Sequence, residues 1–351
     1  MPARNIKLVL GLIAGLGFFP REAEACGGIG IDPRLAAICN LHAANTTPQT
    51  LLSLAHTHQA LTRIGFRDGI QLFPPDEALG LKIAASPTLS FSENINSGLP
   101  NGTLEVAGLS FSPNEDQIRQ TGWLLGFELG AYGSYSLARG SYLEYQATAS
   151  TQRATDYDLR VNRFAVGVCG HFHTGNWRYV DICGNRHIEE RDLSTERLTE
   201  ASLGLSQLWS ASARSYRLSG GVSLNSSKSG ERNTGFTLES EFIGFDGRTG
   251  GIQLELTNGD RASASQDYRA RIWLGGNLRE RPLQGFAEFG STYEGEVLSV
   301  DRVDRTVQLG VAYIPRSNLI VSLGVKTVES SIDYFSTTSP FFSLRYQALT
   351  F

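Results

Sequence analysis

The stretch that decides the fold reads Gly122-Trp123-Leu124-Leu125-Gly126-Phe127-Glu128-Leu129-Gly130-Ala131-Tyr132-Gly133-Ser134-Tyr135-Ser136-Leu137. From Trp123 onward, every second residue is mostly large and apolar, and the residues between are mainly small or polar. This period of two is typical of a β-strand rather than a helix. The run is about seventeen residues long, whereas soluble strands usually have five or six. A two-faced strand of this length is typical of a β-barrel with lipid outside and water inside.

The same alternation recurs along the rest of the chain, for example at Leu143–Ala149, Ile252–Leu256, Val307–Tyr313 and Leu319–Val325. It predicts a mainly β fold, a closed barrel of fourteen antiparallel strands, an even number as bacterial barrels have. We expect the strands at about 82–92, 121–137, 140–151, 158–171, 177–187, 198–211, 214–224, 234–245, 250–259, 266–277, 281–292, 304–314, 318–327 and 340–351.

The connections between these strands alternate between short and long. Short turns are predicted near 138–139, 174–176, 212–213, 246–249, 278–280 and 315–316. Longer loops are predicted at 93–120, 188–197, 225–233, 293–303 and 328–339. Such alternation is expected of an outer-membrane barrel with periplasmic turns and external loops. Closure also removes the edge strands that a long antiparallel sheet would otherwise expose.

The composition agrees with a two-faced wall. Hydrophobic residues make up 41% and charged residues 19% of the chain, and the net charge is −4. A barrel needs only every second strand residue to be apolar, so the modest hydrophobic content does not count against a membrane protein. The negative charge excludes a strongly basic nucleic-acid-binding protein. With 10% aromatic residues, intrinsic disorder is also disfavoured.

Residues 1–25 have the pattern of a signal peptide. Arg4 and Lys7 precede an apolar run, and Ala23-Glu24-Ala25 is a cleavage signal that leaves Cys26 first in the mature chain. The run is about twelve residues, too short for a spanning helix, which needs about 20. We therefore expect export, a location in the outer membrane of a Gram-negative cell and a periplasmic N-terminal segment. A retained membrane anchor and a lipidated Cys26 are the alternatives.

Four cysteines remain after that cleavage, and an even number in an exported chain predicts disulfides. Their spacing favours the pairs Cys26–Cys39 and Cys169–Cys183. An alternative for the second pair is a zinc site, because Cys169, His171, Cys183 and His187 share one strand face. The disulfide is the preferred interpretation, so we expect no metal and no other cofactor.

Residues 26–81 are predicted to form a small helical segment. One helical face, with spacings of three and four, holds Leu51, Leu54, Ala55, His58, Leu61 and Ile64. Phe66, Gly69 and Phe73 then have the spacing found at the waist of a tetratricopeptide repeat. One degenerate repeat or a plain helical hairpin would both fit. Pro74-Pro75 ends the helical pattern and begins a linker to the barrel at residue 82.

The alternation also predicts which charged residues line the lumen. Fourteen strands lie between about eight, which side chains fill, and about sixteen, which leave an aqueous channel. The predicted lumen residues are Glu128, Glu144, Glu239, Glu241, Glu255, Arg269, Arg271 and Glu288. They either line a path or are solvated residues that pair across strands, and they form no ring of one sign that would indicate ion selectivity.

No catalytic motif emerges from the sequence. His187 precedes Asp192 and Ser194 at a predicted strand end, but no nucleophile elbow or paired-carboxylate motif accompanies them. We therefore expect a protein that is not an enzyme.

Two resemblances add to this interpretation. The terminal Phe351 resembles the signal that bacterial outer-membrane proteins offer to the barrel-assembly machinery, and a bulge is expected because apolar parity changes between Tyr346 and Leu349. The stretch Ala84–Ser97, with Asn94-Ile95-Asn96, together with Gly108–Ser112 and Thr121-Gly122-Trp123, resembles the surface lipoprotein assembly modifier (Slam) family. That resemblance implies periplasmic tetratricopeptide repeats, here reduced to one at most, followed by a fourteen-stranded barrel.

The resemblance implies an outer-membrane translocator that helps to deliver a partner lipoprotein or secreted protein to the cell surface. The alternative function is a passive diffusion porin, or a loop-presenting surface barrel without a protein client. In either case the expected partners are outer-membrane lipid and the barrel-assembly machinery.

Overall fold

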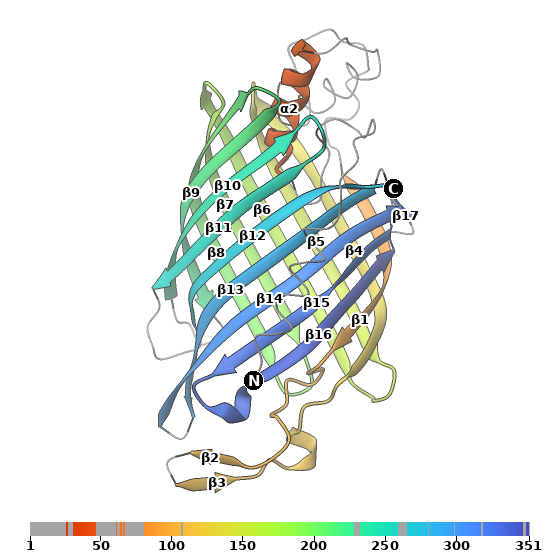
Figure 1. The fold of residues 1–351 in the computed structure, drawn as a ribbon, viewed down its shortest axis with the longest axis vertical. Helices are drawn as coiled ribbons and strands as arrows, with labels where there is room; N and C mark the ends of the chain where they lie inside the picture. The colour runs from red at the N-terminus through yellow and green to blue at the C-terminus, as the bar shows by residue number, and fades with distance from the viewer. Residues whose placement is uncertain are drawn as a thin grey trace.

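The structure is a computed structural model that describes residues 26, 31–46, 61, 64, 66, 81–106, 108–227, 232–258, 265–279, 281–297, 299–316, 319–346 and 349–350. Fourteen antiparallel strands follow one another around a closed barrel, and β1 (Lys82–Ser92) pairs with β16 (Thr337–Tyr346) to close it (Figure 1). The predicted fold class and strand number are therefore confirmed.

The remaining twelve strands of the wall lie close to their predicted positions. They are β4 (Gly122–Ala138), β5 (Ser141–Ala154), β6 (Arg160–Gly175), β7 (Arg178–Glu190), β8 (Thr195–Ala211), β9 (Arg214–Ser227), β10 (Arg232–Gly244), β11 (Thr249–Asn258), β12 (Ser265–Leu278), β13 (Arg281–Val297), β14 (Val300–Arg316) and β15 (Leu319–Ser330).

Several predicted long loops are wrong, because the strands continue into them. The predicted loop 293–303 is instead a hairpin in which β13 and β14 pair as far as Val297 and Val300. Likewise β7 and β8 pair as far as Glu190 and Thr195. In these strand ends the apolar residues no longer recur at every second position, so the alternation that marks a lipid-facing strand stops before the strand does.

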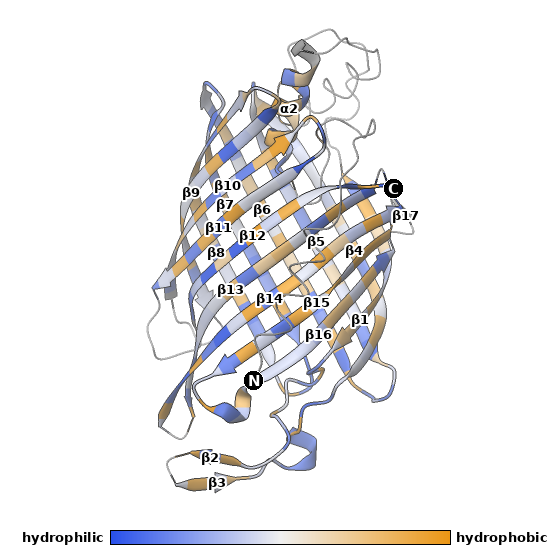
Figure 2. Ribbon diagram, viewed as in Figure 1, coloured by the Kyte–Doolittle hydropathy of each residue, from blue (hydrophilic) through white to orange (hydrophobic). Residues whose placement is uncertain are grey.

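The outer face of the wall is apolar and exposed. Leu205, Leu224 and Leu274 are 65%, 63% and 60% exposed, and most of the residues that alternate with the outward-facing ones are small or polar (Figure 2). Monomeric soluble proteins rarely expose so much contiguous apolar surface. The barrel is therefore membrane-embedded, with its apolar face against lipid. We call the opposite face, which points into the barrel, the lumen face.

Short elements lie at both ends of the barrel. Helix α2 (Pro33–Thr46) is at the end where the short turns lie, and we call this end the turn-side mouth. At the opposite, loop-side mouth, the β1–β4 connection holds a hairpin of β2 (Leu104–Val106) and β3 (Leu109–Phe111) and the 3-10 turn η2 (Glu115–Gln117). A second 3-10 turn, η3 (Asp333–Phe335), joins β15 to β16. No helix among the described residues is long and apolar enough to cross a bilayer.

The predicted bulge near the C-terminus is confirmed. Thr88 to Phe91 of β1 pair with Arg345 to Phe342, whereas Ala84 and Ala85 pair with Thr350 and Leu349 of the short strand β17 (Leu349–Thr350). The register moves by one residue between these stretches, as it does at a bulge. Phe351, like the predicted signal peptide 1–25, lies outside the described residues.

Candidate functional site: a helix docked in the turn-side mouth

Helix α2 begins at a strong N-terminal signal. The Asp32 side chain caps the helix by accepting a hydrogen bond from the backbone N–H of Arg34, at 2.7 Å. Pro33 follows at the first helical position, where its missing N–H costs nothing. These local features fix where the helix starts and place the Asp32 carboxylate and the Arg34 side chain at its entrance.

One face of α2 packs inside the barrel mouth. Leu35 and Ile38 are buried in a cluster with Tyr179 of β7, Leu208 of β8 and Ile243 of β10. All three barrel residues lie on the lumen face, because their neighbours along the strands point outward. The helix therefore sits within the turn-side mouth rather than beside the barrel (Figure 1).

Arg34 carries the strongest polar contacts of the helix. Its side chain is only 3% exposed and forms ion pairs with Asp32 at 2.8 Å and with Asp181 of β7 at 2.7 Å. It also donates to the Ser206 hydroxyl of β8 at 3.1 Å and lies 4.9 Å from the centre of the Tyr179 ring. A cation at this depth is tolerable only because carboxylates and hydroxyls surround it.

A second arginine extends this network across the lumen. Arg217 of β9 lies 3.5 Å from Asp32 and forms ion pairs with Glu239 at 2.8 Å and Glu241 at 3.3 Å, both on β10. On the other side, His171 of β6 bonds to Asp181 at 2.7 Å. The helix entrance is thus coupled to five consecutive strands, β6 to β10.

Burial alone would raise the pKa of Asp32, but Arg34 and Arg217 outweigh it and hold the pKa of this carboxyl below its usual range. Burial likewise lowers the pKa of Arg34, whereas Asp32 raises it, and the net shift is upward. Both groups are therefore charged at neutral pH. Buried ion pairs of this kind add little net stability, yet removing one partner is costly because the other charge is left uncompensated.

Two residues from the predicted repeat region pack on the same mouth. Ile64 is fully buried with Ala37 of α2 and Tyr142 of β5. The Phe66 ring lies 5.2 Å from the Trp177 ring and 5.3 Å from His173. Gly69 and Phe73, the other two residues of the predicted repeat waist, lie outside the described residues. We refer to Ile31–Thr46 together with Ile64 and Phe66 as the docked segment.

The β6–β7 turn is shaped to receive this segment. Asn176 and Trp177 both have positive φ angles, 49° and 58°, as a tight hairpin turn requires. A bulky residue is uncommon in this conformation. The Trp177 ring packs against both hydrophobic clusters that contain residues of the docked segment. This packing offsets the strain of the Trp177 backbone.

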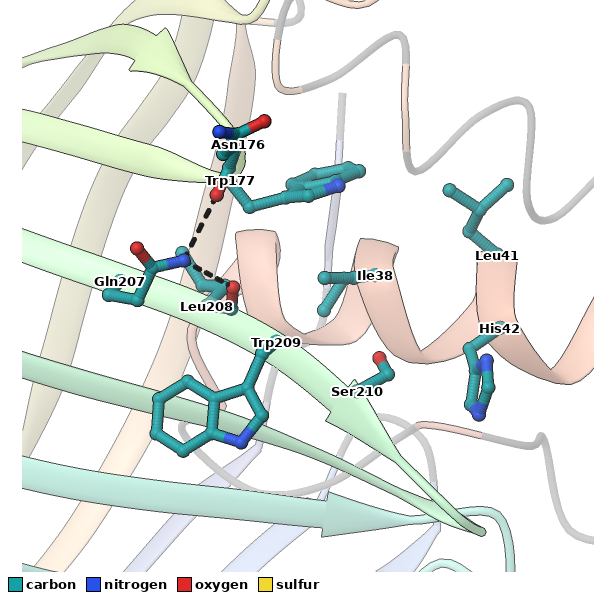
Figure 3. Close-up of a pocket in the computed structure, with 9 residues that line it drawn as sticks. All are labelled: Ile38, Leu41, His42, Asn176, Trp177, Gln207, Leu208, Trp209 and Ser210. Carbon is teal, nitrogen blue, oxygen red and sulfur yellow. Dashed lines mark hydrogen bonds between the residues drawn. The ribbon is translucent and has the colours of Figure 1, made fainter.

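A shallow groove of about 430 Å³ remains between α2 and the rim of β7 and β8. Figure 3 shows Ile38, Leu41 and His42 on its helix side and Trp177, Leu208 and Trp209 on its barrel side. Gln207 fixes the rim by donating to the carbonyl oxygens of Asn176 and Leu208. The helix therefore contacts the wall along one face and leaves a gap along another.

Both predicted disulfides are confirmed. The Cys26–Cys39 bond ties the residue at the predicted mature N-terminus to α2. It uses the sulfur that a lipid thioether would need, so it disfavours lipidation of Cys26. The Cys169–Cys183 bond joins directly opposite residues of β6 and β7. It leaves no thiolate for the alternative zinc site with His171 and His187.

The predicted lumen charges lie on the lumen face, and most of them are paired. Glu128 contacts Arg345 at 3.1 Å, and Glu255 contacts Arg269 at 2.8 Å. Arg271 lies opposite Glu288 in the β12–β13 register and over the Phe286 ring. Glu144 lies 3.6 Å from His171. Through His171 and Asp181, Glu144 is joined to Arg34 of the docked segment, and Glu239 and Glu241 are joined to Asp32 through Arg217.

Sequence reasoning missed the residues that matter most at this mouth: Asp32, Arg34, Asp181 and Arg217. Strand parity would have placed Asp181 and Arg217 on the lumen face, since they share the parity of Cys183 and Ser219. The Asp-Pro sequence before α2 is a recognisable cap signal. No sequence signal joins Arg34 to Asp181, which lies 147 residues away.

The loop-side mouth is organised around the Asn94-Ile95-Asn96 element. Ile95 is fully buried with Leu124, Ala154 and Val161 at the ends of β4, β5 and β6. The Asn96 side chain donates to the Ile118 carbonyl and accepts from the Gln120 N–H, which fixes the return of the loop. Asn96 is therefore an anchor of the loop.

The far part of the same loop packs on the neighbouring β15–β16 connection, across the junction of β1 and β16. Leu104 and Val106 of the β2–β3 hairpin are buried against Ile332 and Phe335 of the β15–β16 connection. The Tyr334 hydroxyl donates to the Pro100 carbonyl. Ser194, part of the weak enzyme alternative, donates to Ser97 of this loop rather than to a histidine.

Comparisons with known proteins do not assign this chain to a family. No model of a protein family and no curated protein matches it. Similar solved structures include a BenF-like porin from Pseudomonas fluorescens Pf-5, with 10% identity, 76% of this chain and 97% of that chain covered, and a TM-score of 0.42. OprB from Pseudomonas putida has 9% identity, with 79% and 95% covered and a TM-score of 0.44. CdiB from Acinetobacter baumannii has 11% identity, with 77% and 60% covered and a TM-score of 0.39.

Proposed function

We propose that this chain is an outer-membrane translocator that delivers a partner lipoprotein or secreted protein to the cell surface. Its turn-side mouth faces the periplasm and is occupied by the docked segment until a client arrives. The observation that carries the proposal is the way this segment is held. It is covalently continuous with the barrel, and it is held in the lumen by a buried network of ion pairs in addition to its apolar contacts with the mouth.

A helix held in this way is suited to reversible release. The Arg34 contacts are short and specific, but a network of this kind adds little net stability, because desolvation cancels much of the attraction. A client that offers its own charges to Asp181 and Arg217 would replace the lost partners and move the helix aside. A permanently open pore has no need for such a segment.

The loop-side mouth and the sequence resemblance support the same function. The resemblance to the Slam family rests on Asn94-Ile95-Asn96, and in the structure these residues set the path of the loop over the mouth. The lumen face between the two mouths is lined by paired charges and small residues, which suits an extended polar chain more than an apolar ligand.

The same polar lumen also supports the alternative function, a passive diffusion porin. The two functions differ in the conductance that they predict. A porin would show a large, steady single-channel conductance in its native form. A translocator with the docked segment in place would show a small or flickering conductance.

The proposal is tested by expressing the chain together with each lipoprotein encoded near it and shaving intact cells with protease. A client should become protease-accessible only when the barrel is present. The Arg153→Met variant, which removes an exposed ion pair with Asp158, should deliver the client normally. If no candidate depends on the barrel and the native chain conducts steadily, the porin is the correct function.

A further inference from the structure

The closing seam between β1 and β16 is unlike the other strand pairs. Among the described residues, β1 pairs with β16 at only four positions, Thr88–Phe91 against Phe342–Arg345, and with β17 at only two. By contrast β8 and β9 pair without interruption from Leu198↔Ser227 to Ala211↔Arg214. Within the part of the chain that the structure describes, the seam is therefore the junction of the wall with the fewest backbone pairings to break.

The sequence of β1 weakens this seam further. Ser86 and Pro87 lie between the two paired stretches, where the register moves by one residue. Proline has no N–H to donate, and for that reason it is rare inside sheets. The strand therefore combines a proline and a register shift at the point where the barrel closes.

Side chains clasp the seam on both faces. On the outer face, the Trp123 ring packs edge-on against Phe91 at 5.4 Å and Phe342 at 5.6 Å, so one ring spans β4, β1 and β16. On the lumen face, Arg345 of β16 reaches over β1 to Glu128 of β4 at 3.1 Å. These side-chain contacts add to the few backbone pairings of the seam, and both can part without disturbing the rest of the wall.

A groove of about 530 Å³ lies at this place. Its lumen-face lining is polar and includes Thr88, Ser90, Ser150, Gln152 and Ser343. The Gln152 amide donates to both Thr88 and Ser90, so this side chain of β5 joins β1 at the groove. The groove brings water-accessible polar groups to within one strand thickness of the lipid-facing surface.

We infer that the β1–β16 seam opens sideways and lets acyl chains of a lipid-bearing client remain in the bilayer while its polypeptide occupies the polar lumen. This inference rests on the proposed function. Each methylene group moved from lipid into a wet lumen would be exposed to water at a cost in free energy. An opening at the seam avoids that cost, because the client's polypeptide then stays in the lumen while its acyl chains stay in the bilayer. The two are joined through the narrow gap between β1 and β16.

The test measures access of lipid chains to the lumen side of the seam. The S150C variant is labelled with the fluorophore NBD and reconstituted in phosphatidylcholine vesicles that contain nitroxide-labelled acyl chains. Ser150 lies on the lumen face beside the groove. We expect quenching at least twofold greater than for the same label at Ser223, a lumen residue of the continuous β8–β9 pair.

A disulfide between S90C and S343C, which are directly opposite across the seam, should reduce the Ser150 quenching to the Ser223 level. A matched S202C/S223C disulfide in the β8–β9 pair should leave the Ser150 quenching unchanged. Equal quenching at Ser150 and Ser223, or quenching that persists in the locked seam, would overturn the inference.

Surface delivery separates this inference from the proposed function. The seam lock should abolish delivery of a lipidated client but not of the same client with its lipid-acceptor cysteine replaced by alanine. If the locked barrel delivers both, the seam is not the exit, yet the translocator stands. If the unlocked barrel delivers neither, the proposed function itself fails.

Discussion

The segments that cover the two mouths of the barrel are held by different sets of interactions. At the turn-side mouth, the docked segment is held by apolar packing together with charged residues: Arg34 lies between Asp32 and Asp181, and Arg217 lies between Asp32 and two glutamates. At the loop-side mouth, apolar clusters around Ile95 and Phe335 hold the β1–β4 loop. Burial of apolar surface is a net stabilising force, whereas a buried ion network mainly fixes geometry. The turn-side cover is therefore the one whose position also depends on charge, and we expect it to be the one that a charged client displaces.

The largest effect is expected from Arg34→Met. The substitution keeps the length of the side chain but leaves Asp32 and Asp181 buried without their cation, at a cost of about 3–5 kcal/mol. The docked segment should leave the mouth, and single-channel conductance in planar bilayers should rise several-fold.

The control for this variant is Arg153→Met, whose pair with Asp158 is exposed. Exposed ion pairs are worth about 0–1 kcal/mol, so its conductance should match that of the native chain. Equal conductance in all three proteins would mean that the docked segment does not limit the pore, and the contrast between the mouths would lose its functional meaning.

A smaller effect is expected from Ile95→Ala at the loop-side mouth. Truncating a fully buried isoleucine costs about 2–5 kcal/mol, here confined to the anchoring of the β1–β4 loop. Protease should cleave the loop at 93–121 faster on intact cells. Leu109→Ala, at a residue 59% exposed in the same loop, should leave the cleavage rate unchanged. Faster cleavage in both variants would show that the cluster is not the anchor.

The smallest effect is expected from Tyr334→Phe, which removes only the hydrogen bond to the Pro100 carbonyl. Such a bond contributes about 0.5–1.5 kcal/mol. Loop protection in hydrogen exchange should fall slightly near Pro100 and stay constant at the turn-side mouth. Tyr157→Phe, at an exposed tyrosine in the β5–β6 connection, is the matched control. A change at the turn-side mouth would mean that the two covers are coupled.

The barrel itself could be predicted from sequence, because lipid outside and water inside impose an alternation that a single strand already shows. Trp123 to Leu137 carries that pattern, and the same rule places Glu128 and Glu255 on the lumen face. The strand ends were not predictable, since residues such as Glu190 and Val300 lie where the pattern of period two has already faded. Hydrophobic periodicity indicates which strand residues face the bilayer, and it does not indicate how far the hydrogen bonding between strands continues.

The docked segment could not be predicted, because its contacts join residues distant in the sequence. The Arg34 side chain contacts Asp181 and Ser206 on two strands of the barrel. Neither the helix propensity of a segment nor the alternation along a strand predicts that a helix enters the lumen. Trp177 is a second example, since nothing in its neighbourhood predicts a left-handed tryptophan. The short closing seam is a third, although its bulge was visible as a change of parity before Leu349.

The most direct test of the central claim asks whether a client passes through the lumen. A client fused to a tightly folded domain is stalled in cells whose barrel carries a photo-crosslinking amino acid at one of two neighbouring positions of β11. Gln253 lies on the lumen face, and Leu254 is 43% exposed on the outer face. The account predicts a client adduct from position 253 and none from position 254. Surface delivery of the client without any adduct at position 253 would contradict it.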